Sequence, residues 1–303
     1  MRQALSDSLV KAAQNNSKVI LLTGDHGYDL FDEFRNRFPD QYLNAGIAEQ
    51  NMVGMAAGLA RVGYFPIVYG LSAFIPVRVL EQMKLDVCHD NLPVIFLGDG
   101  AGFVYSSLGT SHQSTEDIAA TRAIPNLAIY SPADRFEMSA VIDLALDSKL
   151  PTYIRIGKSD VGDVHSQALA LSNDEISVLQ NNGVKICFIA TGSMVRLAAQ
   201  LANEFGASVY SAPILKPFNQ QRFLELISNS DLVVSFEEHS VYGGLGGMIA
   251  EILSENHPIQ LLRIGVGDRF SHHCGSYQYL LKEHRLDIDS VRMKIHNFLA
   301  KKS

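Results

Sequence analysis

The chain has 303 residues, of which 47% are hydrophobic and 19% charged, so it is long enough for two domains and too apolar to be disordered. Its 25 basic and 32 acidic residues leave a net charge of −7, which offers no positive field to a phosphate backbone or an acidic lipid surface. We therefore expect neither a nucleic acid nor a membrane as a partner.

Cysteine usage and hydropathy predict a cytoplasmic location. Cys88, Cys187 and Cys274 are widely spaced and odd in number, and they lack CxxC spacing, which is typical of a reducing compartment. The first residues, MRQALSDSLVKAAQNN, lack the apolar core of a signal peptide. The longest apolar runs are broken well short of the ~20 residues that a transmembrane helix needs.

Five short apolar runs in the first half of the chain predict buried strands. They begin at Val19, Phe65, Pro93, Leu127 and Pro151 and are nearly continuous in Val, Ile and Leu, as parallel strands covered on both faces are. Three stretches between them place apolar residues on helical stripes: Leu5, Leu9 and Ala12; Leu30, Phe31, Phe34 and Phe38; and Met52, Met55, Ala56 and Leu59. Residues 1–165 are therefore predicted to form a doubly wound α/β domain.

A polar stretch separates this domain from a second one. Residues 166–183 carry no strong strand signal and are predicted to be a linker. Alternation then resumes in the runs VKICFIATG, ASVYSAPIL, DLVVSFEEH and IQLLRIGVGD, with helices expected over 194–205, 220–227 and 245–253. Residues 184–303 are thus predicted to form a smaller α/β domain.

Several common site motifs are absent from the sequence. The first predicted strand is followed by TGDHGYD rather than a GxGxxG or P-loop motif, and the GGLGG run at 243–247 has the spacing of a tight turn. No GxSxG nucleophile elbow occurs. The histidine-bearing spots lack the convergent spacing of a zinc site, so we predict no metal ligands on this chain: Cys88 with His89, Ser111 with His112, and His272 and His273 with Cys274.

Glu49 is the most informative single residue. It stands in the first turn of the apolar helix predicted within NAGIAEQNMVGMAAGLA. The helix dipole favours an acidic residue at this position, so the local pattern by itself is explained by capping.

The same segment resembles the GIAEQ segment of transketolase-like thiamine diphosphate enzymes. The resemblance continues through YGLSAF, LGTSHQSTEDIA, IPNLAIYSPAD and PTYIRIGK, and then through ATGSMV, LKPFN and FEEHSVYGGLGG in the same order. It covers essentially the whole chain. It implies a pyrimidine-binding domain followed by a transketolase C-terminal-like domain, without the third domain that holds the cofactor diphosphate and Mg²⁺.

The resemblance implies roles for five residues. Glu49 would be catalytic and bind the cofactor through N1′ of the aminopyrimidine, Phe74 would stack on that ring, and His112 would donate a hydrogen bond to substrate oxygens during catalysis. Asp25 would lie at the active-site wall and bind the cofactor. Ile47 would also bind the cofactor and, together with the neighbouring apolar residues of the helix, would shield Glu49 from water.

Other segments depart from the family pattern. LGDGAG at 97–102 imitates the GDG that opens the diphosphate motif, but the TSHQSTEDIA segment that follows belongs to the pyrimidine domain, so we reject a metal site there. Leu108 stands where the family has an aspartate that hydrogen-bonds a sugar hydroxyl. Gly100 and Asp29 stand where the family has a histidine and a serine that bind the substrate phosphate. Arg155 and Lys158 remain as the basic groups expected to bind substrate.

We therefore predict one subunit of a split transketolase, a transferase that moves a two-carbon ketol unit from a ketose to an aldose. It would need thiamine diphosphate, Mg²⁺ and a partner subunit with the diphosphate-binding domain, in a complex with two copies of each. The substrates would be sugars or sugar phosphates. The alternatives are a subunit of a 1-deoxyxylulose-5-phosphate synthase-like or 2-oxo acid dehydrogenase-like enzyme, and a noncatalytic scaffold of the same fold.

Overall fold

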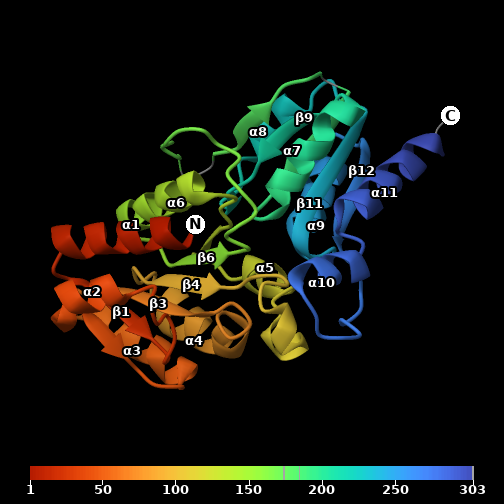
Figure 1. The fold of residues 1–303 in the computed structure, drawn as a ribbon. Coiled ribbons are helices and arrows are strands. Elements are labelled where there is room, and N and C mark those ends of the chain that lie inside the picture. The colour runs from red at the N-terminus through yellow and green to blue at the C-terminus, as the bar shows by residue number, and fades with distance from the viewer. Residues whose placement is uncertain (173–174, 184, 302–303) are drawn as a thin grey trace.

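A computed structural model describes residues 1–172, 175–183 and 185–301, and two sheets organise them (Figure 1). The first has seven strands in the order β10-β5-β6-β4-β3-β1-β2. Their bounds are β1 Val19–Thr23, β2 Tyr42–Asn44, β3 Phe65–Leu71, β4 Ile95–Asp99, β5 Ala128–Tyr130, β6 Thr152–Ile156 and β10 Ile214–Lys216. All pair in parallel except β10, which is antiparallel to β5.

Helices cover both faces of the first sheet. Helices α1 (Arg2–Asn15), α2 (Asp32–Arg37) and α6 (Arg135–Ser148) lie on one face, and α3 (Glu49–Arg61) and α5 (Asp117–Arg122) on the other. The short helix α4 (Leu80–Gln82) continues into a π-helical turn, Met83–Cys88. Each of the five predicted strands is present, and the three predicted stripes fall on or beside α1, α2 and α3, so the doubly wound prediction is confirmed.

The second sheet has five strands in the order β12-β11-β8-β9-β7. Their bounds are β7 Ser177–Gln180, β8 Ile186–Ala190, β9 Ser208–Ser211, β11 Leu232–Ser240 and β12 Gln260–Val266. Helices α7 (Met194–Phe205), α10 (Tyr277–Glu283) and α11 (Ile288–Ala300) share one core with this sheet, while α8 (Gln220–Leu226) and α9 (Leu245–Asn256) belong to the core on its other side. The predicted helix over 194–205 is α7 itself.

Two short strands differ from the sequence prediction. Strand β7 lies inside the segment expected to be a linker without strands; it is a short edge strand, partly exposed, antiparallel to β9. The run ASVYSAPIL, predicted as one strand, breaks at Ala212 and Pro213, and its second part, β10, joins the first sheet. The division of the chain at 166–183 stays a prediction.

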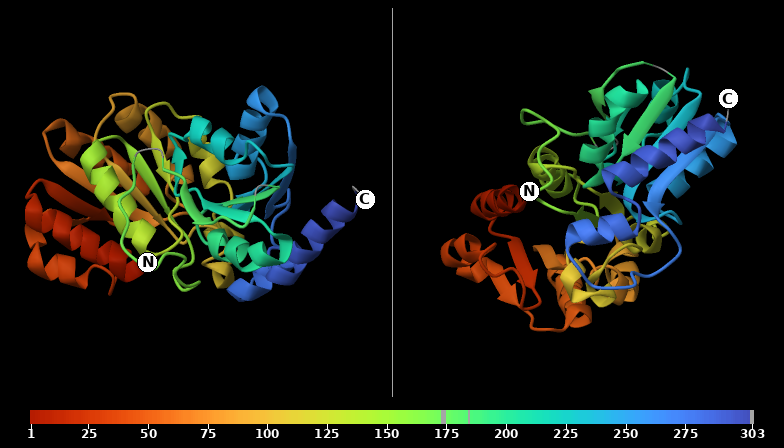
Figure 2. Two further views of the ribbon diagram at one scale, coloured as in Figure 1. Left: turned by 90° about the horizontal axis from the view of Figure 1, so that it is seen from above. Right: turned by 45° about the vertical axis from the view of Figure 1, so that its right-hand side comes forward.

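Each sheet and the helices packed on it form one lobe. The two lobes lie side by side, with the N-terminus near their junction and the C-terminus at the far end of α11 (Figure 2). One apolar core is continuous across the junction, since Ile118 and Leu127 of the first lobe belong to the same cluster as Phe223 and Leu245 of the second. Within the described ranges, no helix combines the length and the apolar character that a bilayer span requires.

Candidate active site

Glu49 is the first residue of α3, and the chain reaches it through a turn in which Gly46 has a φ of +72°. Its side chain is only 5% exposed, and Nη1 of Arg78 donates a hydrogen bond of 2.8 Å to its Oε1. Met52 and Val53 are fully buried in the next turn of the helix. A buried carboxylate needs a charged or hydrogen-bonding partner, and Arg78 supplies it.

Phe74 lies at the centre of a cluster of polar side chains. It follows β3, and the guanidinium carbon of Arg78 is 3.9 Å from the centroid of its ring. The ring of His112 approaches it edge-on at 5.4 Å between centroids, and the ring of His26 lies at 6.5 Å. Glu49, Phe74 and His112 therefore lie in one cluster, because Arg78 contacts both Glu49 and Phe74 and the ring of His112 approaches Phe74. That they form a site for cofactor and substrate stays a prediction.

His112 ends a short 3₁₀ turn, Thr110–His112, beside the cluster. Its Nδ1 lies 3.0 Å from Oγ of Ser111, which fixes the ring orientation. The imidazole is half-buried and faces Phe74, so it is placed to donate a hydrogen bond to a molecule bound against that ring. Its catalytic role stays a prediction.

Asp25 lies at the carboxyl end of β1, directly before His26, and has a φ of +62°. Its Oδ1 accepts hydrogen bonds from the hydroxyl of Tyr28 and from Nδ2 of Asn44. These two bonds, the one from Tyr28 first, lower the pKa of Asp25. The exposed carboxylate therefore stays ionised at the rim of the cluster, and its contact with a cofactor stays a prediction.

Ile47 is placed differently from the expectation. It is 76% exposed, so in this chain it does not shield Glu49 from water. Ile47 lies in the turn that follows Gly46, before the helix begins, whereas Met52 and Val53 in the next turn of the helix are fully buried.

Arg155 also departs from the expectation of a substrate-binding group. It is 1% exposed, its Nε donates to Asp117 at 2.8 Å, and its Nη2 donates to the backbone oxygens of Ser114 and Glu238. Nε and Nη2 are therefore committed to a buried network at the lobe junction. This network gives no support to substrate binding by Arg155, which stays a prediction.

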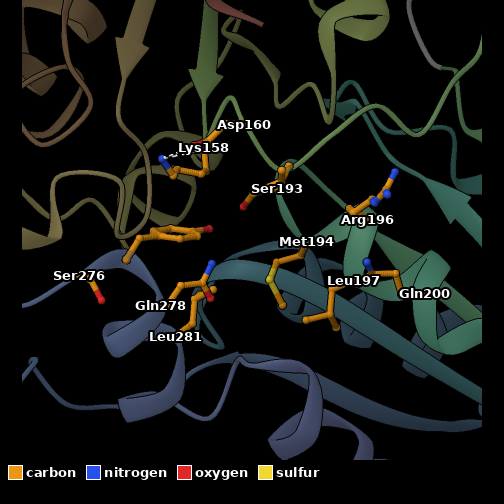
Figure 3. A pocket seen from close by; sticks show the side chains of 12 residues that line it. Lys158, Asp160, Ser193, Met194, Arg196, Leu197, Gln200, Ser276, Gln278 and Leu281 are labelled. Atoms are coloured by element: carbon orange, nitrogen blue, oxygen red, sulfur yellow. Dashed lines mark hydrogen bonds and ion pairs between the residues drawn. The ribbon is translucent and has the colours of Figure 1, made fainter.

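Lys158 lies in a different pocket, shown in Figure 3. This pocket has a volume of about 530 Å³ and lies between the segment after β6, the start of α7 and the start of α10. The ammonium group pairs with Asp160 at 2.8 Å and lies 5.6 Å from the ring centroid of Tyr277. Substrate binding by Lys158 stays a prediction, with no support from the cluster around Phe74.

Two residues of the cluster were not found from the sequence. Arg78 follows Phe74 by four residues, and His26 follows Asp25 directly. Nε2 of His26 is buried and has no hydrogen-bond partner in the described part of the chain. Both residues stand inside or beside segments already singled out, but only the folded chain brings them to the ring of Phe74.

The GDG segment holds a structural carboxylate. Asp99 is 4% exposed and accepts hydrogen bonds from the hydroxyls of Tyr69 at 2.7 Å and Tyr105 at 2.9 Å. Across residues 1–172, 175–183 and 185–301, no group of three or more His, Cys, Asp and Glu side chains is placed to hold a metal ion.

Comparison with known families decides the identity of the fold. The family described as "Transketolase, pyrimidine binding domain" matches residues 1–163, and that described as "Transketolase, C-terminal domain" matches residues 175–291. The chain belongs to the transketolase family. It is accordingly a subunit of a transferase, and enzymes of this family depend on thiamine diphosphate.

Three transketolase relatives are similar to this chain over most of their own length. A subunit of the apulose-4-phosphate transketolase of Actinobacillus succinogenes is 34% identical over 85% of this chain and 85% of its own. The 6-deoxy-6-sulfo-D-fructose transketolase subunit SqwH of a Clostridium species is 31% identical over 100% and 95%. The solved structure of a split gene transketolase, an inactive beta4 tetramer, superposes with a TM-score of 0.89 at 33% identity, over 98% and 97%.

The residues of the cluster around Phe74 fit the aminopyrimidine of thiamine diphosphate. The guanidinium of Arg78 shows that one planar group lies against Phe74 and reaches Oε1 of Glu49 at the same time. An aminopyrimidine ring is planar and carries a nitrogen at its edge, so the same face and the same carboxylate can hold it.

Proposed function

We propose that this chain is the pyrimidine-binding and C-terminal subunit of a split transketolase, which transfers a two-carbon ketol unit from a ketose to an aldose. The observation that carries the proposal is the buried carboxylate of Glu49, held beside the ring of Phe74 with His112 at its edge. The similarity to two relatives named as transketolase subunits supports it.

Each residue would have a defined task. Glu49 would hydrogen-bond N1′ of the aminopyrimidine and share a proton with it, in surroundings that Met52 and Val53 keep dry. Phe74 would orient the ring by stacking. When bound, thiamine diphosphate supplies the nucleophilic carbon that breaks and forms carbon–carbon bonds next to a carbonyl. His112 would donate a hydrogen bond to a substrate oxygen that gains negative charge.

A partner subunit would complete this site. Apolar side chains are exposed close in sequence to the residues of the cluster: Ile47 at 76%, two positions before Glu49; Tyr28 at 59%, two positions after His26; and Leu108 at 55%, four positions before His112. Such a group of exposed apolar residues is typical of an interaction surface. We propose that a subunit with the diphosphate-binding domain covers it, supplies the Mg²⁺ ligands and forms a complex with two copies of each chain. The solved relative supports this need, because that tetramer of one kind of subunit is described as inactive.

The substrate would be a ketose, and the enzyme would select only weakly among ketoses that differ in the configuration of their hydroxyls. Leu108 is exposed and stands four residues before His112, at the position where the family resemblance implies an aspartate that hydrogen-bonds a sugar hydroxyl. The two named relatives act on a sugar phosphate and a sulfonated sugar, so related subunits serve different anionic sugars. The three cysteines are free thiols, which supports the predicted cytoplasmic location.

Reconstitution tests the proposal. The chain is expressed with an affinity tag in its own cells, the proteins that co-purify are identified, and a partner carrying a diphosphate-binding domain is sought. The purified complex is then assayed with ketose donors and aldose acceptors, and in parallel with pyruvate. Ketol transfer that requires both chains is the expected result, whereas turnover of pyruvate alone would favour the decarboxylating alternatives, and no turnover of either would favour a scaffold.

A further inference from the structure

Arg78 makes both contacts that the proposed site offers to the aminopyrimidine ring. Its Nη1 donates to Oε1 of Glu49 over 2.8 Å, and its guanidinium carbon lies 3.9 Å from the ring centroid of Phe74. A guanidinium group is planar and stacks on aromatic faces much as a heteroaromatic ring does. The guanidinium and the aminopyrimidine therefore cannot take this position together.

We infer that Arg78 is a built-in competitor of the cofactor, which must leave Glu49 and Phe74 before the aminopyrimidine can bind. This inference rests on the proposed function, because it assumes that thiamine diphosphate uses these two residues.

The burial of Glu49 explains why the chain carries such a competitor. Its carboxylate is 5% exposed, and an ionised carboxylate enclosed in this way is strongly destabilising without a partner. Arginine stays protonated at neutral pH and satisfies the carboxylate with a charge-assisted hydrogen bond. Arg78 thus stabilises the fold whenever the ring of the cofactor is elsewhere.

The position of Arg78 also allows it to leave. It stands in the middle of a 3₁₀ turn, Val77–Val79, and its backbone N–H donates to the carbonyl of Phe74 at 3.1 Å, which keeps the turn in place. Its side chain is 45% exposed, so rotation of the side chain moves the guanidinium into solvent without a change in the backbone. Movement of the Arg78 side chain alone is therefore enough to free Glu49 and Phe74.

This competition has a consequence for assembly. Binding of the ring must break the contacts of Arg78 with Glu49 and Phe74, so those contacts lower the affinity of the single chain for the cofactor. Contacts between the diphosphate and a partner subunit would offset this loss. Arg78 would thus bias cofactor binding toward the assembled complex.

The test compares Arg78→Met with Arg61→Met. Methionine keeps an unbranched side chain but removes the charge and the planar group. Arg61 ends the same helix as Glu49 and pairs with Asp90 on the surface, so it controls for the loss of an arginine. The dissociation constant of thiamine diphosphate with Mg²⁺ is measured on the full chain by ligand-observed NMR, and the thermal midpoint is measured without ligand.

We expect Arg78→Met to bind thiamine diphosphate about tenfold tighter or better than the unmutated chain, and to melt at a lower temperature without it. Arg61→Met should bind as the unmutated chain does. Equal or weaker binding by Arg78→Met would overturn the inference, because Arg78 would then be neutral or would help to hold the cofactor.

Arg78→Lys keeps the positive charge without the planar face, and its affinity for thiamine diphosphate should lie between those of the unmutated chain and Arg78→Met. If Arg78→Met does not fold, Arg78→Lys provides the test. No gain in its affinity over the unmutated chain would then overturn the inference. Failure of the unmutated complex with its partner to bind thiamine diphosphate would overturn the proposed function, and the inference with it. Binding by that complex, with no gain in either variant, would overturn the inference alone.

Discussion

Nε of Arg155 and Oδ2 of Asp117 are 2.8 Å apart inside the junction of the two lobes, and both side chains are almost fully buried. Arg155 lies on β6 of the first sheet, and its Nη2 also donates to the backbone oxygen of Glu238 on β11 of the second. Burial by itself would lower the pKa of Arg155, but Asp117 raises it overall. One arginine thus connects the two sheets.

Arg155→Met should destabilise the chain strongly. It leaves the buried carboxylate of Asp117 without its cation, which costs about 3–5 kcal/mol in comparable sites. The free energy of unfolding is measured by urea titration. Lys158→Met is the control, because its pair with Asp160 is partly exposed and worth about 1 kcal/mol or less. Similar losses in the two variants would contradict the bridging role of Arg155.

Glu49→Gln should lower the turnover of the reconstituted complex by orders of magnitude while the chain still folds. The amide keeps the shape of the side chain and still faces Arg78, but it cannot take part in proton sharing with the aminopyrimidine. Turnover and the circular dichroism spectrum are compared with those of the unmutated complex. Near-normal turnover would remove Glu49 from the catalytic assignment.

Leu108→Asp should sharpen the choice among ketose donors. An apolar side chain makes no demand on the hydroxyls of the sugar, whereas a carboxylate left unpaired by the wrong substrate destabilises that complex. The ratio kcat/KM is measured for donors of differing hydroxyl configuration, with and without phosphate. If the unmutated complex already discriminates steeply and the variant changes nothing, Leu108 is only a packing residue.

The buried imidazole of His239 should make stability fall as the solution becomes acidic. Burial lowers its pKa from 6.5 to about 4, with Asp117 acting in the opposite direction. Its Nδ1 donates to the backbone oxygen of Ser240 at 2.8 Å, and its Nε2 accepts from the N–H of Ala119 at 3.3 Å, so the neutral form is the one that fits.

The direction of this pH dependence follows from the fact that His239 is protonated at a higher pH in the unfolded chain than in the folded chain. As the pH falls below about 6.5, His239 binds a proton in the unfolded chain, whereas in the folded chain it stays neutral until about pH 4. The contribution of His239 to the free energy of unfolding is therefore complete above pH 6.5 and is lost as the pH falls toward 4. The slope should reach about 1.4 kcal/mol per pH unit at most. His239→Gln should remove this part of the slope in urea titrations at pH 4 to 7. An unchanged slope in the variant would show that other groups carry it.

The sequence predicted the strands that are buried on both faces, because runs such as those at β1 and β4 are continuously apolar. It missed β7, whose residues are partly exposed at a sheet edge and carry no apolar run. Family resemblance brought Glu49, Phe74 and His112 together. It did not reveal Arg78, because the contact of that residue with Glu49 joins two segments 29 positions apart.

The antiparallel pairing of β10 with β5 has a consequence for how the chain can be divided. A fragment that ends in the predicted linker would lose the strand that covers β5 and would expose an open sheet edge, which invites aggregation. The complementary fragment would carry β10 with no sheet to join. A cut after β10 would instead separate β7, β8 and β9 from β11 and β12 of the second sheet. Any natural or laboratory rearrangement that divides the chain in the predicted linker must therefore bring β10 back from the other piece.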